Sequence, residues 1–157
     1  KVDACATWSP NTVTLKKAMG DKYLSLGSNA DYLDKATFPS SFITTEAYAQ
    51  KNEDVLVRFS QAINKAHTYR ADHIDDVAKS VAKHIDAPEE TLLASTKEGD
   101  WTTINQIAGD KAALQKVYET QQNVFIGNGR IKEKVETDKY VLYDIMQKGY
   151  EASKNSK

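Results

Sequence analysis

The sequence predicts an α/β protein in which helices dominate, with a few short strands ahead of a helical C-terminal part. The first ten residues contain small, β-compatible side chains and end in Trp8, Ser9 and Pro10, which is typical of a strand that delivers a loop at its carboxyl end. From Thr45 onward, apolar residues recur instead with the period of a helix. Because the chain opens inside the first strand, we expect it to be a piece of a longer protein.

Strand, helix and loop patterns alternate over the first 44 residues. Residues 11–19 predict a short helix that is followed by glycine, and residues 23–26 alternate weakly as a short strand does. A loop rich in Ser, Asn and Asp covers residues 27–37. Residues 39–44 predict another strand, because Pro39 suits the first position of a strand.

Helical periodicity continues from residue 45 through most of the chain. Thr45 and Asn52 are good N-terminal caps, and Pro88 suits the first position of a helix. The segment 101–107 is ambiguous between an irregular stretch and a brief strand. The expected helices span residues 46–51, 53–66, 72–85, 88–96 and 111–125, followed by a last helix that opens at Thr137 and Asp138.

The charge balance argues against a nucleic-acid partner. The sequence has 21 Lys and Arg residues against 22 Asp and Glu residues, a formal net charge of -1, and no dense basic run that would bind phosphates. No apolar stretch approaches the ~20 residues that cross a bilayer, and no signal-peptide pattern opens the chain. With 40% hydrophobic and 27% charged residues, the composition is that of one folded globular domain.

Motifs typical of catalysis and metal binding are not found in the sequence. It contains no P-loop, no G-x-G-x-x-G, no H-E-x-x-H and no G-x-S-x-G, so we expect neither an enzyme nor a cofactor. Among His67, His73 and His84, only the last two share a helix face, roughly three turns apart, which is too far to chelate one ion. We therefore expect surface histidines and no metal site.

Cys5 is the single cysteine, which rules out an internal disulfide. Its place in the predicted strand makes a small, buried apolar residue the simplest interpretation, with a reactive thiol as the alternative. A buried thiol would be inert, so no chemistry is assigned to it.

The loop after the first strand is the candidate ligand site. Trp8 has a large amphipathic ring that can stack on a ligand, and Thr7, Ser9 and Asn11 supply neutral donors and acceptors beside it. Such a cluster at the amino end of a helix suits an anion or a polar small molecule. The alternative is purely structural, with Trp8 packed in the core and Ser9 capping the helix.

Four stretches of the chain carry a resemblance to a known family. Val2-Asp3-Ala4 followed by Trp8-Ser9-Pro10 is similar to a strand of form V-D-A followed by W-x-P, and residues 42–55 resemble a strand, short helix and K-N-P-E-V helix entry, with Glu53 at the usual proline position. Residues 64–66 with the helix over 75–84 are similar to a pair of helices. Residues 121–131 resemble a closing helix followed by a turn and a G-x-I connector. In order and spacing the four stretches resemble the C-terminal half of type II solute-binding proteins of ABC importers, in the branch of aliphatic sulfonate, taurine, nitrate and thiamine-precursor binders.

This resemblance implies two α/β lobes that face each other across a cleft and close on a ligand by hinge bending. Residues 1–38 would end one lobe, and residues 39–157 would form the crossing strand and the helical remainder of the other. A missing N-terminal half would supply most ligand contacts. In this chain the implied ligand-binding residues are Thr7, Trp8, Ser9 and Asn11, together with Ser40 and Ser41 of the crossing strand.

The implied function is extracytoplasmic capture of a small anionic or polar solute, sulfonate-like in chemistry, for ABC-type import. Its partners would be the solute, the permease subunits and the missing half, and its location would be periplasmic or extracellular, with a lipoprotein anchor as one form. Two alternatives stay open. A thiamine-pyrimidine-synthase-like enzyme on the same fold would need a reactive histidine in the cleft. A helical protein-interaction module would be an autonomous monomer, whereas a fragment would expose apolar surface and could dimerise or swap elements.

Overall fold

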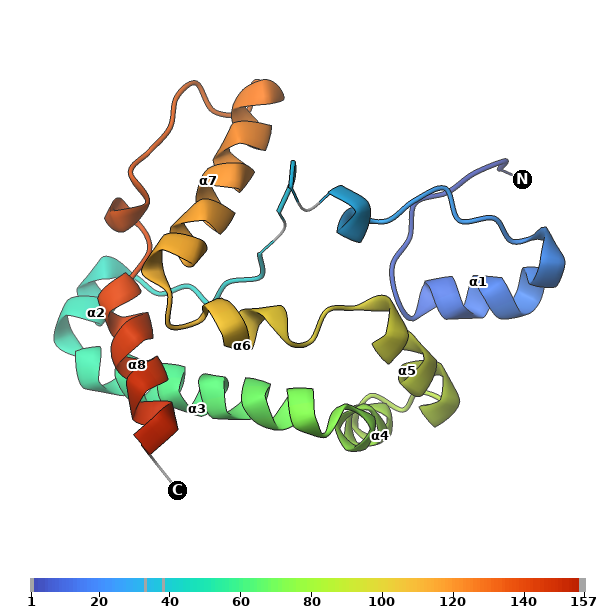
Figure 1. Ribbon diagram of the computed structural model, residues 1–157, viewed down its shortest axis with the longest axis horizontal. Coiled ribbons are helices and arrows are strands. Elements are labelled where there is room, and N and C mark those ends of the chain that lie inside the picture. The colour runs from blue at the N-terminus through green and yellow to red at the C-terminus, as the bar shows by residue number, and fades with distance from the viewer. Residues whose placement is uncertain (1, 33, 38, 156–157) are drawn as a thin grey trace. The chain divides into compact units, whose positions relative to one another are not determined.

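The structure is a computed structural model that describes residues 2–32, 34–37 and 39–155, and every regular element in these ranges is helical (Figure 1). The α-helices are α1 (Asn11–Met19), α2 (Glu46–Lys51), α3 (Glu53–Asp72), α4 (Ile74–His84), α5 (Glu89–Ser95), α6 (Thr103–Ile107), α7 (Lys111–Gly127) and α8 (Tyr143–Asn155). Short 3₁₀ helices span Gly20–Lys22, Asn29–Tyr32, Thr96–Glu98 (η3) and Thr137–Lys139.

The expected α/β architecture, a partial type II binding-protein fold with a few strands, is therefore wrong. The first ten residues and the segments 23–26 and 39–44 carry β-compatible side chains but form no strand. A strand is stable only when its backbone N–H and C=O groups pair with a neighbouring strand, and none of these segments pairs in that way within the described residues. Local residue preference could not supply the missing partner.

The helix predictions are confirmed with shifted ends. The helix expected over 88–96 is α5, which begins one residue after Pro88. The ambiguous segment 101–107 contains the five-residue helix α6. The last helix opens later than expected, because Thr137 and Asp138 form a 3₁₀ helix and α8 begins at Tyr143.

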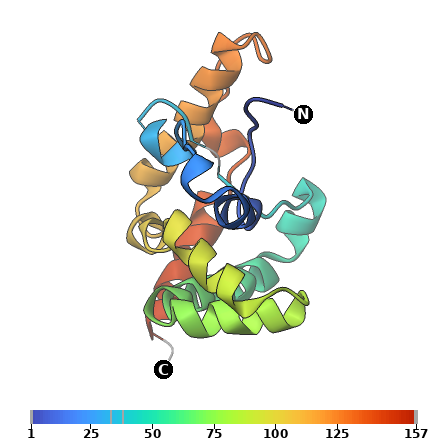
Figure 2. The same ribbon diagram turned by 90° about the vertical axis from the view of Figure 1, so that its right-hand side faces the viewer.

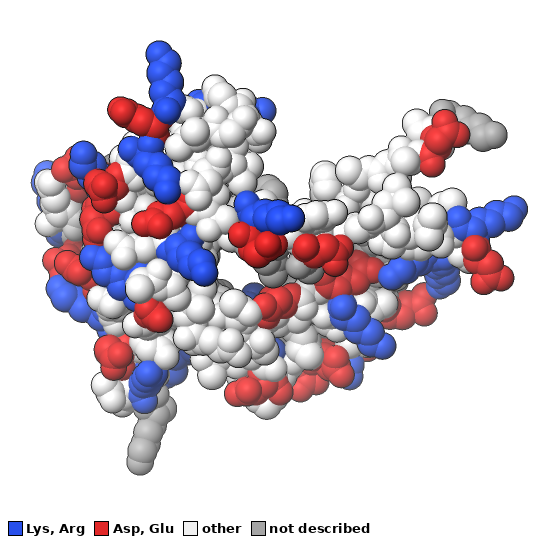
Figure 3. All heavy atoms as spheres, turned by 45° about the horizontal axis from the view of Figure 1, so that its top comes forward, with Lys and Arg blue, Asp and Glu red and all other residues white. Residues whose placement is uncertain are grey.

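The chain divides into two compact units, each built from two separate stretches. The first unit contains Lys1–Leu26 and Tyr69–Trp101, and the second contains Gly27–Thr68 and Thr102–Lys157. The assignment of residues 1–38 and 39–157 to two lobes stays a prediction. The face drawn in Figure 3 shows acidic and basic side chains intermixed.

In the first unit, α4 lies against α5, and α5 lies against α1. Figure 2 shows α4 from the side with α5 next to it. The amphipathic spacing of α4 turns Ala78 and Ala82 inward, where both are buried. The corner after α5 is anchored by Trp101, whose indole Nε1–H donates to the Thr96 carbonyl over 2.7 Å. The Trp101 ring also packs so closely on Gly99 that a Cβ there would clash with it.

In the second unit, α8 packs closely on α3 at Gly149. A Cβ on Gly149 would collide with the side chain of Ser60, so glycine is required there by close approach and not by backbone conformation. Tyr143 at the start of α8 is the largest fully buried side chain of the described residues. Burial of the ring raises the pKa of the Tyr143 hydroxyl.

Candidate functional site

The candidate loop lies directly before the helix α1, as expected, but it does not follow a strand. The Asn11 N–H donates to the Trp8 carbonyl over 2.9 Å, which closes a turn that leads directly into α1. The Ser9–Pro10 peptide bond in this turn is cis. The Trp8 side chain is 76% exposed, and Thr7 and Ser9 are half-buried. The structural alternative for Trp8 is therefore wrong, because its ring lies outside the core.

Cys5 is also exposed, which corrects the expectation of a buried residue. Burial depended on a paired strand with one face on a core, and the segment around Cys5 forms no strand.

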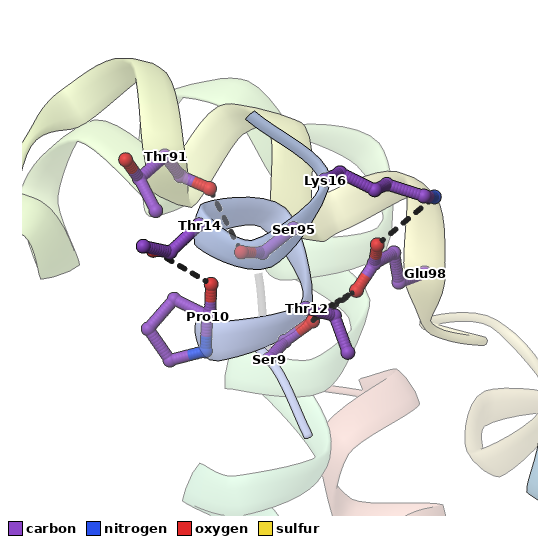
Figure 4. A network of polar contacts seen from close by, with 8 residues as sticks. All are labelled: Ser9, Pro10, Thr12, Thr14, Lys16, Thr91, Ser95 and Glu98. Carbon is purple, nitrogen blue, oxygen red and sulfur yellow. Dashed lines mark hydrogen bonds and ion pairs between the residues drawn. The ribbon is translucent and has the colours of Figure 1, made fainter. Parts of the chain in front are cut away.

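Two hydroxyl groups of the loop and α1 converge on one carboxylate (Figure 4). The Ser9 hydroxyl donates to Glu98 Oε2 over 2.5 Å, and the Thr12 hydroxyl donates to the same oxygen. Lys16 Nζ lies 3.5 Å from the other carboxylate oxygen, Oε1. We call Ser9, Thr12, Lys16 and Glu98 the Glu98 cluster.

The hydroxyl donors determine the charge state of the Glu98 cluster. They hold the pKa of the Glu98 carboxyl below its ordinary value of 4.5, with the Ser9 hydrogen bond as the largest cause, the Thr12 hydrogen bond next and Lys16 adding to both. Desolvation opposes this shift without reversing it. Glu98 is therefore ionised at neutral pH.

Glu98 supplies a negative charge that α1 lacks. No acidic residue lies in the first turn of α1, and no side chain caps it. A carboxylate near the amino end of a helix is favoured by the helix dipole and by the unpaired backbone N–H groups there. Ser9 therefore binds a carboxylate instead of capping α1, so the capping alternative is wrong as well.

A second ion pair joins α1 to α5, whereas the pair of Lys16 and Glu98 joins α1 to η3. Lys17 of α1 lies 2.7 Å from the carboxylate of Glu90 in α5, and both side chains are largely exposed. The hydrogen bond between them raises the pKa of Lys17 and lowers the pKa of Glu90. Glu90 contacts α1 through Lys17 instead of through Ser9 and Thr12, so it provides a matched comparison for Glu98.

Ser40 and Ser41 belong to the second unit, apart in the chain from the loop before α1. Both are exposed in an irregular segment. The Ser41 hydroxyl lies 3.0 Å from the Tyr118 hydroxyl of α7 and can hydrogen-bond to it. Within the first unit the structure brings Ser9 together with Thr12 and Glu98, two residues that the sequence pattern does not indicate.

Thr12 and Glu98 were missed for a physical reason. Glu98 follows Thr12 by 86 positions, so no local spacing connects them. The one available signal was the sequence of α1 itself, which has a hydroxyl at Thr12 and no acidic residue in its first turn.

The histidines lie on helices or at their ends, with His67 in α3, His73 directly before α4 and His84 at the end of α4. His73 stacks on Tyr69 with ring centroids 4.4 Å apart, and it lines a shallow open hollow with Asp72, Asp75 and Asp76. No group of three or more His, Cys, Asp or Glu residues among the described residues is placed to hold a metal ion. Within the same part of the chain, no helix has the length and apolar character needed to cross a membrane.

Comparison with known proteins gives one weak similarity. No family model matches the chain, and no solved structure matches it. The chain is 22% identical over 134 residues to the Bacillus subtilis (strain 168) protein named "Putative binding protein YtlA". The match covers 85% of this chain and 39% of that protein, so the chain spans well under half of its relative. At this coarse level the similarity is consistent with a binding protein without catalytic activity, and it identifies no ligand, importer or family.

Proposed function

We propose that this chain contributes to the capture of a small anionic or polar solute, sulfonate-like in chemistry, for import by an ABC transporter. Thr7, Trp8, Ser9 and Asn11 form one wall of the site. The observation that carries the proposal is the Trp8 ring, which is 76% exposed beside a turn that opens the helix α1. The similarity to a binding protein supports the same class of function.

The chemistry of the loop suits a ligand with an apolar tail and an oxyanion head. An exposed indole can bury part of its surface against an alkyl group, at about 25 cal/mol per Å² of apolar area removed from water. The hydroxyls of Ser9 and Thr12 already hold an oxyanion, the carboxylate of Glu98. A sulfonate presents oxygens of the same kind to the same donors.

The proposal includes the permease subunits of an importer as partners and the N-terminal half of a longer protein as the second wall. It also includes a location in the periplasm or outside the cell, where a lipid anchor could attach the protein to the membrane. Ser40 and Ser41 are proposed as further ligand contacts. Because the chain exposes large apolar residues, we also propose that it can form a homodimer or swap elements with a second copy. No specific observation favours the synthase alternative, since His73 and His84 stand at the two ends of α4.

Isothermal titration of the chain with ethanesulfonate tests this function. We expect measurable binding that Trp8→Ala weakens at least about tenfold, because the variant loses the apolar surface against the alkyl group. Leu24→Ala is the matched control, because Leu24 is 78% exposed in the same unit and lies outside the loop. Binding that is equally weakened by both substitutions, or unchanged in Trp8→Ala, would remove Trp8 from the site. The function would be contradicted if neither the unmodified chain nor Glu98→Ala binds ethanesulfonate, taurine or nitrate.

A further inference from the structure

We propose that Glu98 is an internal competitor of the solute: its carboxylate occupies the hydroxyl donors of Ser9 and Thr12, and an incoming anion must displace it. The inference rests on the proposed function and adds a form of regulation to the same site. It follows from the Glu98 cluster, in which a residue from η3 reaches the loop before α1 (Figure 4).

The first argument is the number of donors. A hydroxyl group has one proton and donates one hydrogen bond at a time. Both Ser9 and Thr12 donate to Oε2 of Glu98, and their own hydroxyl oxygens lie 3.1 Å apart. While Glu98 stays in place, a second oxyanion can contact these two hydroxyl oxygens only as another acceptor, which is repulsive. The site is therefore closed to anions in this conformation.

The second argument is charge. The lowered pKa of Glu98 keeps its carboxylate ionised at neutral pH, so an approaching anion meets a like charge. Lys16 lies 3.5 Å from Oε1 and is the cation that the structure records on this carboxylate. Displacement of Glu98 removes the like charge from the donors and frees Lys16 for the solute in the same movement.

The third argument is that Glu98 can leave without unfolding its surroundings. Trp101 anchors the backbone around η3 through its hydrogen bond to Thr96 and its packing on Gly99. The Glu98 side chain is 24% exposed and has a flexible stem, so rotation about its side-chain bonds brings the carboxylate into water. The open form is thus a rotamer of one side chain, and the apparent affinity for the solute is the intrinsic affinity multiplied by the fraction of molecules in the open form.

Titration of the full chain with ethanesulfonate at neutral pH tests the competition. We expect Glu98→Ala to bind ethanesulfonate at least about fivefold more tightly than the unmodified chain. Glu98→Gln keeps the size of the side chain and removes its charge, so it should also bind ethanesulfonate more tightly. If circular dichroism shows that Glu98→Ala does not fold, Glu98→Gln provides the test. Glu90→Ala is the control, because it removes the other carboxylate that contacts α1 and should change affinity less than about twofold.

The outcomes separate the two proposals. Tighter binding in Glu98→Ala or Glu98→Gln but not in Glu90→Ala supports the competition, also where the unmodified chain shows no binding. If the unmodified chain binds ethanesulfonate and both Glu98 variants bind it equally well or more weakly, the competition is overturned and the proposed function stands. If the chain and both variants bind neither ethanesulfonate, taurine nor nitrate, the proposed function is overturned and the competition with it.

Discussion

Neighbouring residues of the loop before α1 differ in their contacts with the rest of the unit. Trp8 is exposed although its ring is large and apolar, whereas Ser9 is tied by its hydroxyl to Glu98. The pattern of residue types indicated the loop as a candidate site. The structure adds the hydroxyl of Thr12 and the carboxylate of Glu98, which places a negative charge on the hydroxyl donors. An anion-binding interpretation therefore requires Glu98 to move, which no local pattern indicated.

The pH dependence of stability tests the Glu98 cluster without any ligand. Because the folded pKa of Glu98 is lowered from 4.5, its interactions stabilise the native state fully above that value and are lost as the pH falls through the lower, folded pKa. We expect Glu98→Gln to have a lower melting temperature than the unmodified chain at pH 7. The difference should shrink below pH 4.5, where Glu98 takes up a proton and resembles Gln. Thermal denaturation followed by circular dichroism measures it, and a difference that is constant from pH 7 down to pH 3 would contradict the cluster.

Among the elements, helices and strands differ in how far sequence reasoning could reach. The apolar spacing of α4 lies within the eleven residues of the helix, and it predicts the helix correctly because a helix closes its hydrogen bonds within itself. The segment 39–44 has equally clear strand residues, yet it is irregular because its partner strand would have to come from elsewhere. The irregular segment after α7 differs from both, because the buried side chain of Gln122 in α7 holds it in place.

Gln122 provides the test at this scale. Its amide is buried in α7, accepts a hydrogen bond from the Val135 N–H over 2.7 Å, and donates to the Val135 carbonyl and the Tyr140 hydroxyl. We expect Gln122→Ala to lower the free energy of unfolding by about 1–3 kcal/mol, because these groups lose their partner. Urea denaturation measures the loss, and hydrogen exchange at the Val135 amide should become faster.

Asn123→Ala is the control for this change, because Asn123 is the exposed neighbour in the same helix. It should alter the free energy of unfolding by less than about 0.5 kcal/mol. Equal losses in both variants would mean that α7 itself, and not the link to Val135 and Tyr140, had been weakened.

At the scale of the whole molecule, most buried apolar residues of the described chain are small, and several large apolar residues are exposed. The buried apolar residues of the described chain are Ala49, Ala78, Ala82, Ala108, Leu114 and Tyr143. The most exposed large apolar residues are Val2, Trp8, Leu24, Leu26, Phe42 and Ile43, and each of them lies in an irregular segment. These are the segments that the sequence predicted to be strands or the loop after one. Each unit therefore takes most of its stability from helix packing. These segments add isolated contacts, such as the edge-to-face contact of Phe42 with Phe59 of α3.

Paired substitutions check this distribution. Ile43 is 93% exposed and Leu114 is 4% exposed. We expect Ile43→Ser to change the free energy of unfolding by less than about 0.5 kcal/mol, because almost no burial is lost. Leu114→Ala should cost about 2–5 kcal/mol, since it removes buried methyl groups and leaves a cavity in the packing of α7. Urea denaturation measures both, and a large loss in Ile43→Ser would show that residues 39–44 are packed.

The spacing of apolar residues along the chain was enough to place the helices, because a helix depends on contacts within a few residues. The residue types around Trp8 indicated a candidate site, which stays a prediction. Whether the β-compatible segments pair depends on a second strand, and the residue that faces Ser9 lies 89 positions away in η3. Contacts over such distances leave no local signal in a single sequence. The fold class and the negative charge at the candidate site therefore came from the packing of the chain, and both differ from what local preference indicates.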